Sequence, residues 1–213
     1  MKRQRGFQTG HLRRLFRGGI RKPDPAKGRA PHIDIPDAGR SDRDEVDRLR
    51  GTFERWARLK SPLPEELIRR GLAAIRIDRG ALGEAVRFAE AGCRETRLYE
   101  SEHFAVDVLC WRSGQLGPIR DHGGSACGLL VVEGTAAEII FEDTPCGKLV
   151  PMRSYAVPEG TVSVARSGEV HAVGNLQAGD VDLIGILVSS PPGPGGRTRD
   201  LSETVFGPTG PGG

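Results

Sequence analysis

The sequence predicts a mainly β domain, an antiparallel β-sandwich or β-barrel, preceded by a short N-terminal helical segment. From Leu98 onward the chain contains six short runs rich in Val, Ile and Leu: HFAVDVLCW, CGLLVVEG, AAEIIFED, KLVPMRSYAV, GTVSVARSG and VDLIGILVSS. Glycine, proline or charged turns separate these runs, and no helical pattern lies between them, which is typical of antiparallel sandwiches and barrels. Asp107 interrupts the first run, and we expect its carboxylate to be exposed or paired with a loop.

Three helices are expected in residues 41–92, a helical preface to the β region. In 41–59, Ser41 or Asp42 can cap a helix whose apolar residues recur at three- and four-residue steps, namely Val46, Leu49, Phe53 and Trp56. The stretch 62–75 predicts a second helix, because Pro64 lies near its start and acidic residues fill its first turn. A third helix is expected over 80–92.

The two ends of the chain predict no regular structure. Residues 1–40 lack periodicity and are basic, with no acidic residue before Pro23, whereas the net charge of the whole chain is only +3. Such an arm suits nucleic-acid binding, an organelle transit peptide or a disordered leader, and we expect the leader. The tail, 193–213, is rich in Pro and Gly. The β domain therefore spans 93–192.

The composition of the chain argues against several classes of function. No run of eighteen apolar residues occurs, so we expect no membrane association. Binding of nucleic acid is not expected either, because the arm lacks interleaved aromatic residues and the remainder of the chain is nearly neutral. The four cysteines form no CxxC pair, and no secretion signal precedes them, so reduced thiols in the cytoplasm are expected. We expect a monomer.

Two histidine-bearing segments of the β region are candidates for chemistry. In the first, PIRDHGGSAC, an extended backbone places Arg120 and His122 on the same face of a strand. Histidine can ligate a metal, whereas arginine stays protonated and cannot. The second segment, PEGTVSVARSGEVHAVGN, carries His171 and Asn175. These residues alone leave open whether the first segment is a metal site that lacks one ligand or is not a metal site at all.

Together with VLCWRSGQ, GLLVVEGTAAEIIFE and ILVSSPP, these segments resemble the signature blocks of the cupin barrel, and more specifically those of the cysteine dioxygenase family of thiol dioxygenases. The resemblance covers roughly residues 93–192 and implies a cupin-type antiparallel β-barrel, also called a double-stranded β-helix. It implies a non-heme Fe(II) that uses O2 to oxidise a small thiol to a sulfinate. By position, His122 and His171 match two of the family's three iron ligands, and Cys127 matches its cysteine, which in some members is cross-linked to a tyrosine.

Three positions depart from the family pattern. Arg120 occupies the place of the first iron-binding histidine. Glu95 aligns with the arginine that holds the substrate carboxylate, although a shift of one residue would place Arg94 there instead. Val188 or Ser189 stands where the tyrosine is expected, so no thioether cross-link is expected. We consider two consequences: Arg120 forms a salt bridge with Glu95, or Glu95 becomes a third metal ligand beside the two histidines, a set that suits Fe(II).

These departures leave two functions open. In the first, the chain is a thiol dioxygenase whose Arg120 and Glu95 line the catalytic cavity and favour a thiol that carries a cationic group. In the second, Fe(II) is weakly bound or absent, because a guanidinium repels a divalent ion. The chain is then a catalytically inactive cupin that acts as a binding or regulatory module.

Overall fold

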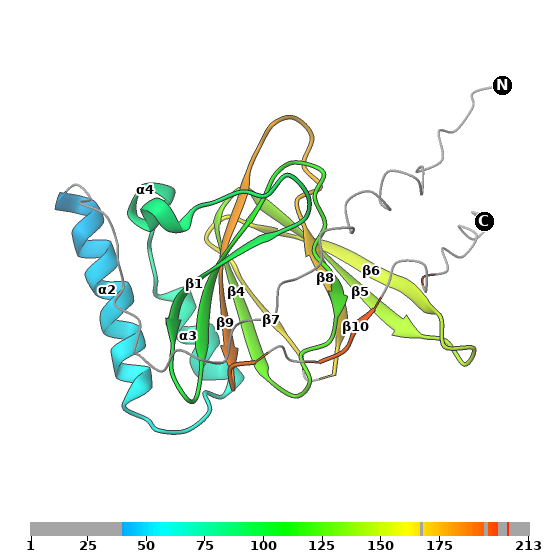
Figure 1. Ribbon diagram of the computed structural model, residues 1–213, viewed down its shortest axis with the longest axis horizontal. Helices are drawn as coiled ribbons and strands as arrows, with labels where there is room; N and C mark the ends of the chain where they lie inside the picture. The colour runs from blue at the N-terminus through cyan, green and yellow to red at the C-terminus, as the bar shows by residue number, and fades with distance from the viewer. Residues whose placement is uncertain (1–39, 167, 194–195, 200–203, 205–213) are drawn as a thin grey trace.

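The computed structural model describes residues 40–166, 168–193, 196–199 and 204, so nearly all of the predicted basic arm lies outside the described residues. Two five-stranded antiparallel sheets form the body of the protein, and the helices lie on one side of it (Figure 1). The predicted class, a mainly β barrel with a short N-terminal helical segment, is confirmed. Within the described residues, no helix combines the length and apolar character that a membrane crossing requires.

The first two helices follow the predicted pattern. Helix α2 (Arg40–Ala57) buries Val46, Leu49, Phe53 and Trp56. Helix α3 (Glu65–Ala73) begins directly after Pro64, with two glutamates in its first turn, where negative charge stabilises the helix dipole.

The third helix is shorter than predicted. Asp78 caps the N-terminus of helix α4 (Arg79–Leu82), and its side chain accepts a hydrogen bond from the backbone N–H of Ala81 at 2.9 Å. After it comes one 3-10 turn, η1 (Gly83–Ala85), and then irregular chain. Gly83 has a φ of 51° and a ψ of −126°, a backbone conformation that suits glycine and lies outside the helical region, so the apolar spacing over 86–92 does not continue as α-helix.

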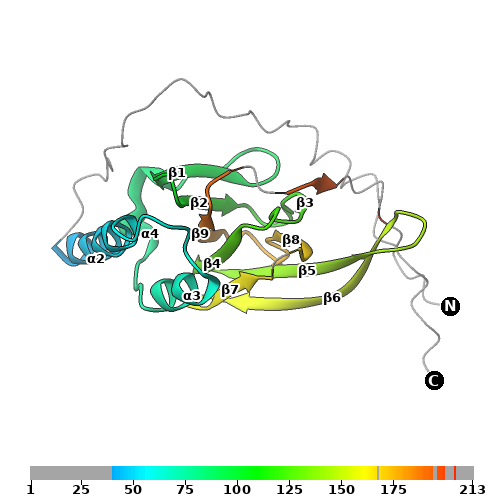
Figure 2. The same cartoon turned by 90° about the horizontal axis from the view of Figure 1, so that it is seen from below.

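The strands are arranged as in a double-stranded β-helix, the cupin-type barrel. The first sheet has the order β1 (Arg94–Glu100), β2 (Ala105–Trp111), β9 (Leu183–Ser190), β4 (Ala126–Glu133), β7 (Val162–Ala165). The second has the order β10 (Thr198–Arg199), β3 (Ile119–Arg120), β8 (Val170–Gly174), β5 (Thr135–Asp143), β6 (Leu149–Pro158). Each of the six predicted runs overlaps one of these strands, namely β2, β4, β5, β6, β7 and β9. The β5–β6 hairpin extends away from the helices (Figure 2).

Helix α3 packs directly on β4 because of a glycine. A Cβ atom on Gly128 would lie 2.6 Å from Cγ2 of Ile68, so a larger residue would push the helix off the sheet. Ile68 and Leu72 are fully buried at this contact. Burial of one such side chain contributes roughly 1.5–3 kcal/mol, and the helices therefore share one apolar core with the first sheet.

Two local expectations were wrong. Asp107 is buried rather than exposed, and it accepts a hydrogen bond from Nε of Arg97 at 2.6 Å. The reason is register: Arg97 on β1 lies directly opposite Asp107 on β2. Residues 193–213 are also not entirely irregular, because β10 adds to the edge of β3 and Arg199 forms an ion pair with Asp143.

Candidate functional site

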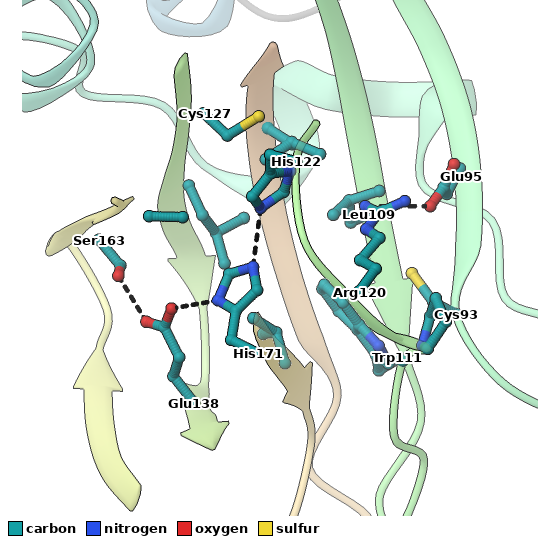
Figure 3. A pocket seen from close by; sticks show the side chains of 16 residues that line it. Cys93, Glu95, Leu109, Trp111, Arg120, His122, Cys127, Glu138, Ser163 and His171 are labelled. Atoms are coloured by element: carbon teal, nitrogen blue, oxygen red, sulfur yellow. Dashed lines mark hydrogen bonds and ion pairs between the residues drawn. The ribbon is translucent and has the colours of Figure 1, made fainter. Parts of the chain in front are cut away.

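A cavity inside the barrel brings the candidate residues together. It is lined by apolar side chains of both sheets, Leu109, Trp111, Leu129, Val173 and Leu187 among them. Its polar lining includes all five residues that the sequence singled out, which are Glu95, Arg120, His122, Cys127 and His171 (Figure 3). About 50 Å³ is open to the centre of a water molecule, which is room for a few waters or a small ligand.

The two histidines meet in this cavity. Nε2 of His122 lies 2.7 Å from Nε2 of His171, and the two rings are nearly perpendicular at 70°. His171 lies on β8 directly opposite Arg120 of β3, and His122 follows two residues later, before a turn in which Gly123 and Gly124 have positive φ. Burial, and then His171 and Arg120, lower the pKa of His122 from 6.5 to about 4. His122 is therefore neutral at physiological pH, as a metal ligand must be.

Glu138 contacts His171 at Nδ1, on the side of the ring opposite His122, and the sequence did not predict this residue. Its Oε1 lies 2.6 Å from Nδ1 of His171, and its Oε2 accepts a hydrogen bond from the Ser163 hydroxyl at 2.5 Å. Burial alone would raise the pKa of Glu138, but the hydrogen bonds from His171 and Ser163 lower it below its ordinary range. The sequence did carry a signal for Glu138. Buried and partly exposed residues alternate along β5, and Glu138 lies between the buried residues Ala136 and Ile140 on its inward face.

Arg120 forms the predicted ion pair with Glu95. Nη2 of Arg120 lies 3.8 Å from Oε1 of Glu95, across the gap between β3 and β1. The two side chains are 26% and 43% exposed, whereas the side chain of His171 is only 9% exposed and His122 is also buried. A half-exposed pair at this distance stabilises the fold by no more than about 1 kcal/mol. Its more important effect is to place a carboxylate beside the charge of Arg120.

The cysteine of the motif has a serine hydroxyl beside it. Sγ of Cys127 lies 3.5 Å from the Ser189 hydroxyl, at one of the two positions where the family pattern has its tyrosine. Burial raises the pKa of the Cys127 thiol, so it remains protonated at neutral pH. Cys93, which was not singled out, also lines the cavity, and burial raises its pKa well above the ordinary value.

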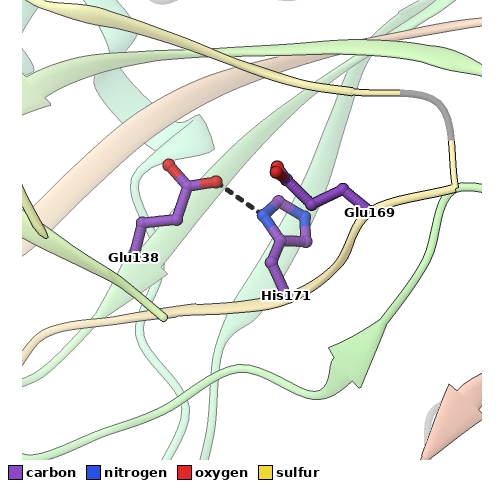
Figure 4. Close-up of side chains that lie close together, drawn as sticks. All are labelled: Glu138, Glu169 and His171. Atoms are coloured by element: carbon purple, nitrogen blue, oxygen red, sulfur yellow. Dashed lines mark hydrogen bonds and ion pairs between the residues drawn. The ribbon is translucent and has the colours of Figure 1, made fainter. Parts of the chain in front are cut away.

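Among the described residues, one group of three side chains has the proximity that a metal ion requires. Glu138, Glu169 and His171 each offer a ligand atom within 4.8 Å of the others (Figure 4). Glu169 also pairs with Arg153, at 3.4 Å. Glu95 does not belong to this group, and no other group in the described part of the chain combines Glu95 with both histidines. The alternative in which Glu95 joins the two histidines as a third ligand is therefore not supported by the described residues.

No protein-family model matches the chain, and no curated protein matches it. Solved structures similar to it include a protein with a double-stranded β-helix domain from Klebsiella pneumoniae, with 21% identity over 53% of this chain and 83% of that chain, TM-score 0.44. Another, from Thermus thermophilus, has 20% identity over 50% and 90%, TM-score 0.42. An RmlC-like cupin family protein from Methanocaldococcus jannaschii has 16% identity over 46% and 80%, TM-score 0.38.

Because these TM-scores lie below 0.5, the fold assignment rests on the strand order of the chain itself. That order makes the chain a cupin-type antiparallel β-barrel, in which Glu138, Glu169 and His171 form a group of residues that could bind a metal.

Proposed function

We propose that the chain is a thiol dioxygenase-like enzyme in which His122 and His171 hold Fe(II). The substrate would be a small thiol, and both atoms of O2 would end on its sulfur, so that RSH and O2 give RSO2H. The electrons that sulfur loses are those that O2 gains, and no other reductant is required. Fe(II), when bound, supplies the binding and activation of O2.

One observation carries this proposal, namely the convergence of the two Nε2 atoms 2.7 Å apart inside the cavity. Imidazole nitrogens suit Fe(II), and a ligand histidine usually donates its other ring N–H to a carboxylate. Glu138 occupies that position for His171. The donor set thus fits a two-histidine metal site, with the remaining coordination positions left to substrate and O2.

The other cavity residues have roles that follow from their chemistry. The apolar walls exclude water from the histidine pair. Arg120 and Glu95 present one positive and one negative charge at the more exposed part of the cavity and would orient a charged group of the thiol. The positive charge of Arg120 also lowers the affinity of the site for a metal ion, although Glu95 offsets part of that charge.

The test is metal content followed by O2 consumption. The full-length protein is incubated anaerobically with Fe(II), freed of excess metal and analysed for iron, with about one iron per chain expected. Uptake of O2 is then measured with thiols of neutral, anionic and cationic character. His122→Ala and His171→Ala should both lose iron and activity, whereas His103→Ala, outside the cavity lining, should retain them. Absence of iron and of thiol-dependent O2 uptake in the wild type would overturn the proposal.

A second candidate function is a metal-free binding module. It is favoured by Arg120, which stands where the family has a third histidine, and by the direct contact between the two histidines, which pairs their nitrogens without an ion. This candidate predicts that small charged molecules bind equally well before and after treatment with a chelator, and that no thiol is oxidised.

A further inference from the structure

We propose that Glu138 is a positioning residue that keeps the proton of His171 on Nδ1, so that the lone pair of Nε2 faces the cavity. The inference about metal affinity rests on the proposed function. The inference about the proton does not, because it concerns the metal-free protein.

The geometry leaves His171 with two different partners. Oε1 of Glu138 lies 2.6 Å from Nδ1, and Nε2 of His122 lies 2.7 Å from Nε2 on the opposite side of the ring. A neutral imidazole has one N–H donor and one acceptor nitrogen, and an ionised carboxylate can only accept. The ring proton must therefore lie on Nδ1 to pair with Glu138, and Nε2 is left as the acceptor.

Ser163 completes this arrangement from the other sheet. Its hydroxyl donates to Oε2 of Glu138 at 2.5 Å, so each carboxylate oxygen accepts a hydrogen bond. Ser163 lies on β7 of the first sheet, whereas Glu138 and His171 lie on β5 and β8 of the second. Glu138 is 1% exposed, and water therefore does not compete for these bonds. Closure of the barrel, rather than one strand, sets the orientation of the ring.

The same arrangement suits metal binding through Nε2. A histidine ligates through a nitrogen without a proton, and the hydrogen bond made by its other nitrogen decides which one that is. Without Glu138, the proton of His171 could move to Nε2 and block the nitrogen that faces His122. Loss of a partner of this kind typically weakens metal binding by about 10- to 100-fold.

The experiment measures the tautomer first. Protonated and unprotonated ring nitrogens differ clearly in ¹⁵N chemical shift, and the chain has five histidines, so His171→Gln identifies the signal of His171. In the metal-free wild type we expect only the Nδ1–H form. Glu138→Gln, which offers a donor as well as an acceptor, should populate the Nε2–H form. Glu138→Leu, which offers neither, is the second variant if the glutamine variant does not fold.

Glu142→Gln is the matched control, because it is the same change at an exposed position of the same strand, and it should leave the His171 signal unchanged. A wild type with Nε2–H or with both nitrogens protonated would overturn the proposal, as would an unchanged Nδ1–H signal in the Glu138 variants.

The second measurement is the affinity for Fe(II), determined anaerobically by equilibrium dialysis. Glu138→Gln should bind about 10- to 100-fold more weakly than the wild type, and Glu142→Gln equally well. If Glu169→Gln loses as much affinity as Glu138→Gln, the ion lies at the two carboxylates and Glu138 is a ligand rather than a positioning residue. If the wild type binds no Fe(II), the proposed function fails, while the tautomer measurement still decides the role of Glu138.

Discussion

Nε2 of His122 lies 2.7 Å from Nε2 of His171, although 49 positions of sequence separate the two residues. The pairing of β3 with β8 creates this contact, because it sets Arg120 directly opposite His171. Arg120, His122 and Glu138 thus surround one imidazole ring. The following predictions concern these residues and the packing that supports them.

Replacement of Arg120 by histidine should strengthen metal binding. Arg120→His removes a positive charge from the cavity and adds an imidazole at the position directly opposite His171. Arg120→Gln is the control that removes the charge without adding a ligand. We expect a gain of about tenfold in Fe(II) affinity for the glutamine variant and a larger gain for the histidine variant, where tenfold corresponds to about 1.4 kcal/mol. Equal affinities in the two variants would show that position 120 does not reach the metal.

Loss of His171 should destabilise the protein as well as the metal site. His171→Ala leaves the buried carboxylate of Glu138 without its N–H partner, which costs about 1–3 kcal/mol. Urea unfolding of the metal-free protein measures this cost. The double variant His171→Ala, Glu138→Leu should recover part of the stability, because no buried carboxylate then remains with an oxygen that lacks its partner. A double variant less stable than the single one would contradict this explanation.

Stability should fall as the pH decreases from about 6.5 toward 4. The pKa of His122 is about 4 in the folded protein and 6.5 when unperturbed, so between these values the unfolded chain binds a proton that the folded protein does not. Acid therefore favours unfolding, by at most about 3 kcal/mol for a shift of this size. The pKa of Glu138 is also lowered on folding, and its contribution is lost as the pH falls below 4.5. His122→Gln should show a shallower decrease between pH 6.5 and 4 in urea unfolding.

Alanine at Gly128 should destabilise the contact between α3 and β4. The added methyl group would lie 2.6 Å from Cγ2 of Ile68 and 3.2 Å from Cδ1 of Leu72, and such overpacking costs about 1–3 kcal/mol. Gly51→Ala is the control of opposite sign. Gly51 lies inside α2 with only the Arg55 side chain nearby, at 3.6 Å, so alanine should stabilise that helix by up to about 1 kcal/mol. Both values are measured by urea unfolding.

Alkylation should distinguish the four thiols. Cys146 is exposed, and its pKa is lowered by hydrogen bonding to Thr144, so it should react first with iodoacetamide at neutral pH. Cys110 and Cys127 are buried, and burial raises the pKa of both thiols, so they should react only when the protein unfolds. Cys93 is partly exposed and its pKa is raised, so it should react more slowly than Cys146. Peptide mass spectrometry of the folded and urea-unfolded protein measures the order. Early modification of Cys127 would show that the cavity opens in solution.

The sequence by itself determined the secondary structure and the chemical character of the site. Apolar spacing predicted α2 and α3, and six β-rich runs predicted β2, β4, β5, β6, β7 and β9, because periodicity is a local property of the chain. The motif residues also led to His122, His171 and the pairing of Arg120 with Glu95. Local cues were weaker where a single glycine decided the outcome, as at Gly83, which ends the third helix early.

The tertiary structure decided which inward-facing residues meet. The alternation of β5 shows that Glu138 faces inward, but only closure of the barrel and strand register bring it to His171 and to Ser163 of the other sheet. Register likewise buries Asp107 against Arg97, where sequence alone predicted an exposed aspartate. In the folded chain Glu95 lies beside Arg120, and it does not belong to the group of residues that could bind a metal. Contacts between distant strands depend on the relative placement of whole elements, which local patterns of residues do not encode.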